Sequence, residues 1–140
     1  LQEILELDSR PVHLVGESLG SGVATYLAGK FNEQVRGVLL VTPFTSLSDV
    51  ARVHYGMLPV GALLSERYDS LQALDQYRGP VAFLIAANDE IVPAKLGHKL
   101  YESYDGPKWL HEQRGAGHNT LNFDPSASWW RELMAFWQSN

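Results

Sequence analysis

The chain has 140 residues, 45% of them hydrophobic and 11% aromatic, which is enough to bury one core. The formal net charge is −5, and the lysines and arginines are scattered, which argues against a nucleic-acid partner. Cysteine is absent, which excludes disulfides, thiolate catalysis and cysteine metal sites and is compatible with the cytoplasm, where we expect the protein. No apolar run approaches the roughly 20 residues of a membrane span.

Apolar periodicity predicts four strands that alternate with helices, and therefore an α/β fold: one domain, residues 1–140, with a parallel sheet of about four strands and helices on both faces. Residues 1–7 fit the last turns of an amphipathic helix, and the segment 44–68 is irregular or contains short helices. The expected strands are 12–15, 36–41, 80–86 and 108–113, and the other expected helices are 19–30, 69–77, 94–104 and 126–138.

The run Gly16-Glu17-Ser18-Leu19-Gly20 lies between the first strand and the following helix. Gly-x-Ser-x-Gly in this setting is typical of a nucleophile elbow, in which the serine takes a strained conformation and exposes its hydroxyl. We expect the two glycines to be needed because strand and helix pack too closely for side chains. An ordinary serine in a glycine-rich turn is the alternative. A serine hydroxyl is a weak nucleophile, so a base and an orienting acid must follow.

Asp89 and His118 are the candidates for the acid and the base. Asp89 follows the strand 80–86, at the carboxyl end where open α/β sheets gather their site residues. The alternative for Asp89 is a turn or an N-cap, and its neighbour Glu90 is a second acid that lies off the motif position. His118 stands between Gly117 and Asn119 after the last strand, where a solvated loop histidine is the alternative.

The remaining histidines, His13, His54, His98 and His111, are interpreted as structural or incidental. None of them has a convincing metal-ligand spacing, so we expect neither a metal nor a cofactor. The run Ser18 to Gly22 superficially suggests a phosphate loop, but it lacks the glycine spacing and the Gly-Lys-Ser/Thr ending of such loops.

Together these motifs resemble the serine-dependent α/β hydrolases, which share the elbow, the Thr42-Pro43-Phe44 run, the Asn88–Pro93 run and the chain order serine, acid, histidine. Within that superfamily the sequence is most similar to the Bem46-like, ABHD13-like and ABHD17-like group. The resemblance covers Pro11 onward and implies the C-terminal half of an α/β-hydrolase fold. It implies that Ser18, Asp89 and His118 form the catalytic triad and that the Leu19 backbone N–H contributes to the oxyanion hole.

A complete α/β hydrolase commonly runs to roughly 200–250 residues, so the resemblance implies that a first half is missing. That half normally supplies the second oxyanion-hole donor. It also normally covers the edge of the strand Val12–Val15, and an unpaired edge invites association. Two hypotheses follow: a fragment of a longer hydrolase, or a short protein that forms homo-oligomers through the Val12–Val15 edge.

The expected function is hydrolysis of a small-molecule carboxylic ester or thioester, or of an amide, through an acyl-enzyme on Ser18. The alternative is a truncated hydrolase half with weak or no activity that self-associates. The segment 44–68 either forms a cap over the site, in which case its apolar residues favour an acyl group, or simply packs against the core.

Overall fold

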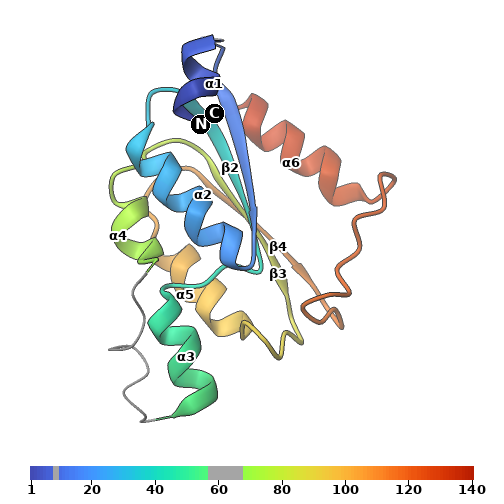
Figure 1. The fold of residues 1–140 in the computed structure, drawn as a ribbon. Helices are drawn as coiled ribbons and strands as arrows, with labels where there is room; N and C mark the ends of the chain where they lie inside the picture. The colour runs from blue at the N-terminus through green and yellow to red at the C-terminus, as the bar shows by residue number, and fades with distance from the viewer. Residues whose placement is uncertain (8–9, 57–67) are drawn as a thin grey trace.

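The computed structural model describes residues 1–7, 10–56 and 68–140. Helices and strands alternate along these ranges, and both termini lie at the same end of the molecule (Figure 1). The elements are α1 (Gln2–Leu7), β1 (Val12–Glu17), α2 (Leu19–Lys30), β2 (Val35–Val41), α3 (Leu47–Tyr55), α4 (Ser70–Leu74), β3 (Val81–Ala86), α5 (Ala94–Ser103), β4 (Lys108–Gln113) and α6 (Ser128–Gln138).

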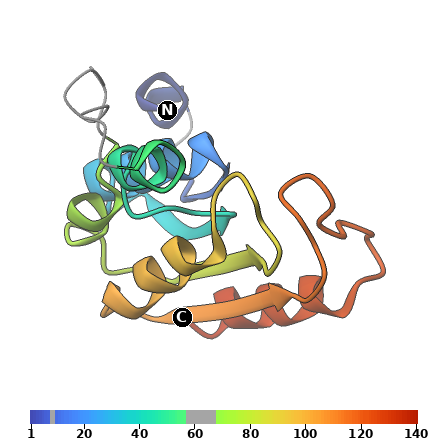
Figure 2. The same cartoon turned by 90° about the horizontal axis from the view of Figure 1, so that it is seen from below.

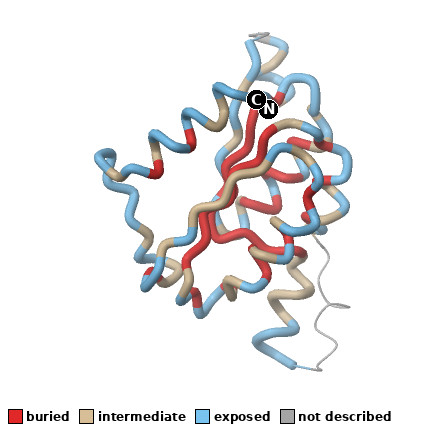
Figure 3. The backbone as a smooth tube through the Cα atoms, turned by 180° about the vertical axis from the view of Figure 1, so that it is seen from behind, coloured by how far each residue is buried: buried red, intermediate tan, exposed pale blue. Residues whose placement is uncertain are grey.

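The four strands form one parallel sheet in the order β1-β2-β3-β4, as the alternation of strands and helices predicted. Strand β3 is buried at every position, and this explains why its sequence, Val-Ala-Phe-Leu-Ile-Ala, shows no polar alternation. The two outer strands are only partly buried, in contrast to the buried centre of the sheet (Figure 3). All strand carboxyl ends meet at one edge, because the strands are parallel.

Helices cover both faces of the sheet, again as predicted, and α6 is the only described helix against one of them (Figure 2). On the opposite face, α2, α4 and α5 bury a cluster that includes Ala28, Leu74 and Leu100 against strand residues such as Phe83. Under α6, the residues Trp129 and Leu133 pack against β2 and β3. Burial of these apolar groups on both faces supplies the main stabilisation of the sheet.

The predicted helix 69–77 is shorter in the structure, where α4 ends at Leu74. The Asp69 side chain caps it by accepting a hydrogen bond from the Gln72 N–H at 3.0 Å. Tyr77 leaves the helix because its ring is fully buried in the core and its hydroxyl donates to the Val35 carbonyl at 3.1 Å. Tertiary packing therefore overrides the apolar periodicity at this end of the segment.

The segment 44–68 contains one described helix, α3, which begins after the N-cap Ser46 and ends at Tyr55. Phe44 is buried with Val92 and Leu96 in a small cluster, so this residue packs against the core. Met57, Leu58 and Pro59, which the cap hypothesis invoked, lie outside the described residues.

Among the described residues, no helix has the length and apolar character needed to cross a membrane.

Candidate active site

Ser18 stands at the sharp turn between β1 and α2. Its backbone has φ 50° and ψ −121°, a conformation that costs a non-glycine residue roughly 1–3 kcal/mol and persists only when its surroundings enforce it. The Ser18 N–H donates to the Val41 carbonyl at 2.9 Å, and the Ser18 carbonyl accepts from the Ser21 N–H at 2.9 Å and from the Ser21 hydroxyl at 2.6 Å. These bonds hold the turn from both sides and leave the Ser18 side chain at the carboxyl edge of the sheet.

The two glycines of the elbow have different roles. A Cβ on Gly16 would lie 2.3 Å from the Gly20 carbonyl oxygen and 2.7 Å from the Ala24 Cβ, so Gly16 allows α2 to cross β1 closely. A Cβ on Gly20 would meet no described atom within 4 Å. The expectation that crowding requires both glycines is therefore right for Gly16 and wrong for Gly20, because the space beside Gly20 is open.

Three side chains from distant parts of the chain meet at the carboxyl edge of the sheet. His118 Nε2 lies 3.0 Å from Ser18 Oγ, and His118 Nδ1 lies 2.7 Å from Asp89 Oδ2. With the proton on Nδ1, the imidazole donates to the carboxylate, and Nε2 accepts from the serine hydroxyl. The side chains of His118 and Asp89 are only 11% and 1% exposed, so the contact is shielded from water. The predicted site residues Ser18, Asp89 and His118 are thus brought together.

The loop after β3 fixes the orientation of Asp89. Its Oδ1 atom accepts from the backbone N–H groups of Ile91, at 2.9 Å, and Val92, at 2.7 Å, which leaves Oδ2 for His118. Glu90 is exposed, and the structure places Asp89 beside the imidazole. The Asp89 side chain binds its own loop backbone, a local pattern that aspartate readily adopts in turns.

The loop that carries His118 is tied to the loop that carries Asp89. The Asn88 N–H donates to the Ala116 carbonyl at 2.8 Å, and the Gly117 N–H donates to Thr120 Oγ1 at 2.8 Å. Gly115 has a φ of 80°, which glycine adopts without strain, and this turns the chain back after β4. Because β3 and β4 are adjacent and parallel, the loops that follow them place Asp89 and His118 next to each other.

Leu19 is the first residue of α2 and directly follows Ser18. Backbone N–H groups in the first turn of a helix have no acceptor within that helix, and the helix dipole adds partial positive charge there. The start of α2 is therefore electrostatically suited to negative charge that develops next to Ser18.

Three of the other four histidines, His13, His98 and His111, contact groups outside this constellation. His13 stacks on Trp137 with ring centroids 4.5 Å apart, and burial, followed by the charge of Arg36, lowers the pKa of His13. His111 stacks on Trp109, and His98 Nε2 lies 2.5 Å from a Glu112 carboxylate oxygen. Within the described ranges, no group of three or more histidines and acids could hold a metal ion.

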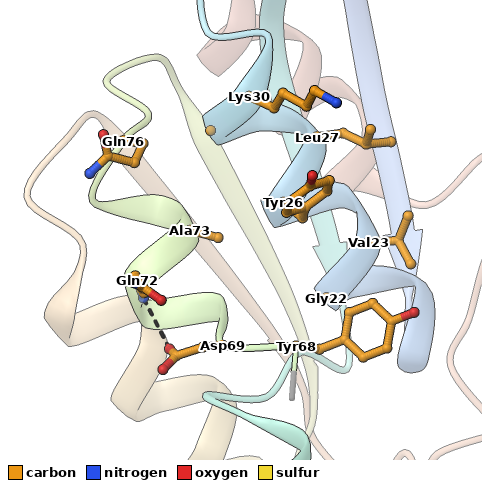
Figure 4. A pocket seen from close by; sticks show the side chains of 11 residues that line it. Gly22, Val23, Tyr26, Leu27, Lys30, Tyr68, Asp69, Gln72, Ala73 and Gln76 are labelled. Carbon is orange, nitrogen blue, oxygen red and sulfur yellow. Dashed lines mark hydrogen bonds between the residues drawn. The ribbon is translucent and has the colours of Figure 1, made fainter. Parts of the chain in front are cut away.

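A separate groove of about 1000 Å³ runs between α2 and α4 (Figure 4). Val23 and Tyr26 of α2 line one side, and Ala73 and Gln76 line the other. Ser18, Asp89 and His118 are not among its lining residues, so this groove is distinct from the candidate site.

Comparison with known proteins identifies the family of this chain. Residues 2–69 match the family model described as the alpha/beta hydrolase fold. Over 114 residues, the chain is 36% identical to the uncharacterized protein Rv2307c of Mycobacterium tuberculosis, an alignment that covers 81% of this chain and 40% of that protein. The chain belongs to the α/β-hydrolase superfamily.

Two further proteins extend the comparison. The chain is 31% identical over 109 residues to the lysophosphatidylserine lipase ABHD12 of Danio rerio, covering 66% of this chain and 28% of the lipase. Its fold is similar to that of Est1E from Butyrivibrio proteoclasticus, with a TM-score of 0.75 and 14% identity over 99% of this chain and 68% of Est1E. The chain thus spans less than half the length of these sequence relatives. Membership of the Bem46-like, ABHD13-like and ABHD17-like group stays a prediction.

Two features of the site were missed by the sequence analysis. The first is the pair of N–H groups from Ile91 and Val92, which hold the acid. The available signal was an aspartate after a predicted strand, four residues before Pro93 and the predicted helix 94–104. The second is His54, taken as incidental, whose Nε2 lies 2.6 Å from the Ile91 carbonyl oxygen. No sequence pattern links residues 37 positions apart in this way.

Proposed function

We propose that this α/β hydrolase is a serine hydrolase that cleaves a carboxylic ester or thioester through an acyl-enzyme on Ser18. The observation that most supports the proposal is the continuous contact from Ser18 Oγ to His118 Nε2 and from His118 Nδ1 to Asp89 Oδ2. The hydrogen bonds follow the order of nucleophile, base and orienting acid that acyl transfer requires.

In the proposed reaction, Ser18 Oγ attacks the substrate carbonyl carbon while its proton passes to His118 Nε2. The resulting oxyanion accepts a hydrogen bond from the Leu19 N–H at the start of α2. Collapse of this intermediate expels the alcohol or thiol, which takes the proton from His118 and leaves the acyl group on Ser18. Water then repeats the sequence: it gives a proton to His118 and attacks the acyl carbon, the bond from this carbon to Ser18 Oγ breaks, and Ser18 Oγ takes the proton from His118 as the carboxylic acid is released. Asp89 holds the Nδ1–H tautomer and stabilises the imidazolium throughout.

We propose that the second N–H donor of the oxyanion hole comes from outside this chain or from another loop of the chain that takes over this role. Loss of one such donor typically costs roughly 2.7–4 kcal/mol of transition-state stabilisation, a factor of about a hundred to a thousand. We therefore expect slow turnover by the 140-residue chain alone.

The direct test is the intact mass of the protein after incubation with a fluorophosphonate, whose phosphorus is attacked by Ser18 Oγ with loss of fluoride. We expect one adduct per chain on the unmodified protein and none on Ser18→Ala. Ser103→Ala is the matched control, because Ser103 is an exposed helical serine that bonds only to the Lys99 carbonyl among the described groups. Labelling that persists in Ser18→Ala, or no labelling of the unmodified chain, would contradict the proposal.

A second candidate, which we also propose for testing, is self-association through the Val12–Val15 edge of β1. It is favoured by the apolar exposure around that edge: Val15 is 66% and Leu19 52% exposed, and the space beside Gly20 is open. A second copy related by a two-fold axis would pair its β1 antiparallel to this one and extend the sheet. Light scattering at micromolar concentration is expected to give twice the chain mass, and Val15→Lys is expected to restore the monomer. A monomeric mass for the unmodified chain would refute this candidate.

A further inference from the structure

His54 lies on α3, outside the triad, yet it contacts the loop that orients Asp89. Its Nε2 atom lies 2.6 Å from the Ile91 carbonyl oxygen. A carbonyl oxygen only accepts, so Nε2 carries the proton and donates. His54 is itself exposed.

The hydrogen bond from His54 affects Asp89 because both side chains bond to the same peptide group, the one between Ile91 and Val92. The Ile91 carbonyl and the Val92 N–H belong to one planar, trans peptide group, so their directions are fixed relative to one another. The carbonyl accepts from His54, and the N–H donates to Asp89 Oδ1 at 2.7 Å. Rotation of this peptide would break both hydrogen bonds together.

Among the described residues, side-chain packing holds the two residues of this peptide unequally. The Ile91 side chain is 49% exposed and gives the loop little packing, whereas the Val92 side chain is buried against Phe44 and Leu96. Val92 therefore anchors the position of the chain, and the hydrogen bond from His54 sets the rotation of the preceding peptide. Leu47 and Val50 of α3 pack on the same cluster, which keeps the helix that carries His54 against the loop.

We propose that His54 is a positioning residue that fixes the Ile91–Val92 peptide and thereby the orientation of the Asp89 carboxylate toward His118. The inference rests on the proposed function of the triad. The contacts form a continuous series from His54 through this peptide to Asp89, His118 and Ser18, and hydrogen bonds in such a series polarise and strengthen one another.

The first test follows the backbone and needs no activity. Amide hydrogen exchange at Val92 is measured by NMR for the unmodified chain, His54→Ala, His54→Gln and His98→Ala. A neutral hydrogen bond shifts an equilibrium by a factor of about 2 to 13, and we expect Val92 exchange to accelerate by that factor in His54→Ala. His54→Gln retains an N–H donor and is expected to restore part of the protection.

The second test measures the rate of fluorophosphonate labelling at increasing reagent concentration. This gives the maximal rate and the half-saturating concentration separately. We expect His54→Ala to lower the maximal rate by a similar factor of about 2 to 13 and to leave the half-saturating concentration unchanged, because the residue acts on the triad and not on the ligand. His98→Ala is the matched control: His98 is also a partly exposed helical histidine, bonded to Glu112 away from the acid loop.

The two tests separate failure of this inference from failure of the proposed function. If the unmodified chain is not labelled, the hydrolase proposal fails, and Val92 exchange alone decides whether His54 holds the peptide. Unchanged Val92 exchange in His54→Ala overturns the inference, as does an equal effect of His98→Ala. Accelerated exchange with an unchanged labelling rate also overturns it, since the peptide would then move without affecting the acid.

Discussion

Substitution of Gly16 by alanine tests how closely the elbow is packed. The added Cβ would lie 2.3 Å from the Gly20 carbonyl oxygen, 2.8 Å from the Gly20 carbonyl carbon and 2.7 Å from the Ala24 Cβ. Two of these atoms are backbone and the third is a methyl group fixed to the helix, so no flexible side chain can yield. The start of α2 must therefore move until the first distance opens from 2.3 Å to beyond 3.0 Å.

The expected penalty follows from this displacement. Overpacking of this kind typically destabilises a protein by about 1–3 kcal/mol, which for a chain of this size lowers the unfolding midpoint by about 3–12 °C. Ser18 lies between Gly16 and the displaced helix, so its hydroxyl shifts relative to His118. A misplacement approaching 1 Å can reduce the rate by up to about a hundred-fold, and we expect fluorophosphonate labelling to slow by about 10- to 100-fold.

The matched control is Gly20→Ala, the same chemical change at the other glycine of the motif. Its Cβ meets no atom of the described residues within 4 Å, and alanine is favoured over glycine in a helix by about 1 kcal/mol. Thermal unfolding and labelling rates of the two variants are compared with those of the unmodified chain. The packing argument is refuted if Gly16→Ala keeps full stability and labelling, or if Gly20→Ala is equally damaging.

Three further predictions concern the acid, a buried hydroxyl and the pH dependence of stability. Asp89→Asn should reduce fluorophosphonate labelling by at least about a thousand-fold with little loss of secondary structure, because an amide no longer holds the Nδ1–H tautomer; near-normal labelling would remove Asp89 from the triad. Tyr77→Phe deletes the hydroxyl that donates to the Val35 carbonyl and should lower the free energy of unfolding by about 1 kcal/mol in urea titrations, whereas no loss would show that the bond is replaced. The lowered pKa of His13 means that the folded chain binds fewer protons than the unfolded chain below about pH 6.5, so stability should fall as the pH drops through that range. Between pH 7.5 and pH 5.5 the melting temperature should fall less for His13→Phe than for the unmodified chain. An identical decrease in both would contradict this assignment.

Local sequence patterns predicted a helix or strand well where turn signals mark both of its ends. The helix 19–30 and the strand 108–113 match the structure residue for residue, since each is bounded by clear turn signals. The helix near 69–77 was predicted too long, because burial of the Tyr77 side chain in the core stabilises the fold more than an extension of α4 would. Apolar periodicity alone cannot show which buried surface a side chain will join.

The sequence by itself predicted the α/β class and the parallel sheet, because strands and helices alternate along it, and it singled out Ser18, Asp89 and His118 as triad candidates, because each lies in a motif after a strand. Only the tertiary structure decided how those residues are held. The crowding at Gly16, the lack of it at Gly20 and the contact from His54 to the Ile91 carbonyl depend on how β1, α2, α3 and the β3–α5 loop pack. Distances of this kind arise from packing between separate elements, and no pattern within one element encodes them.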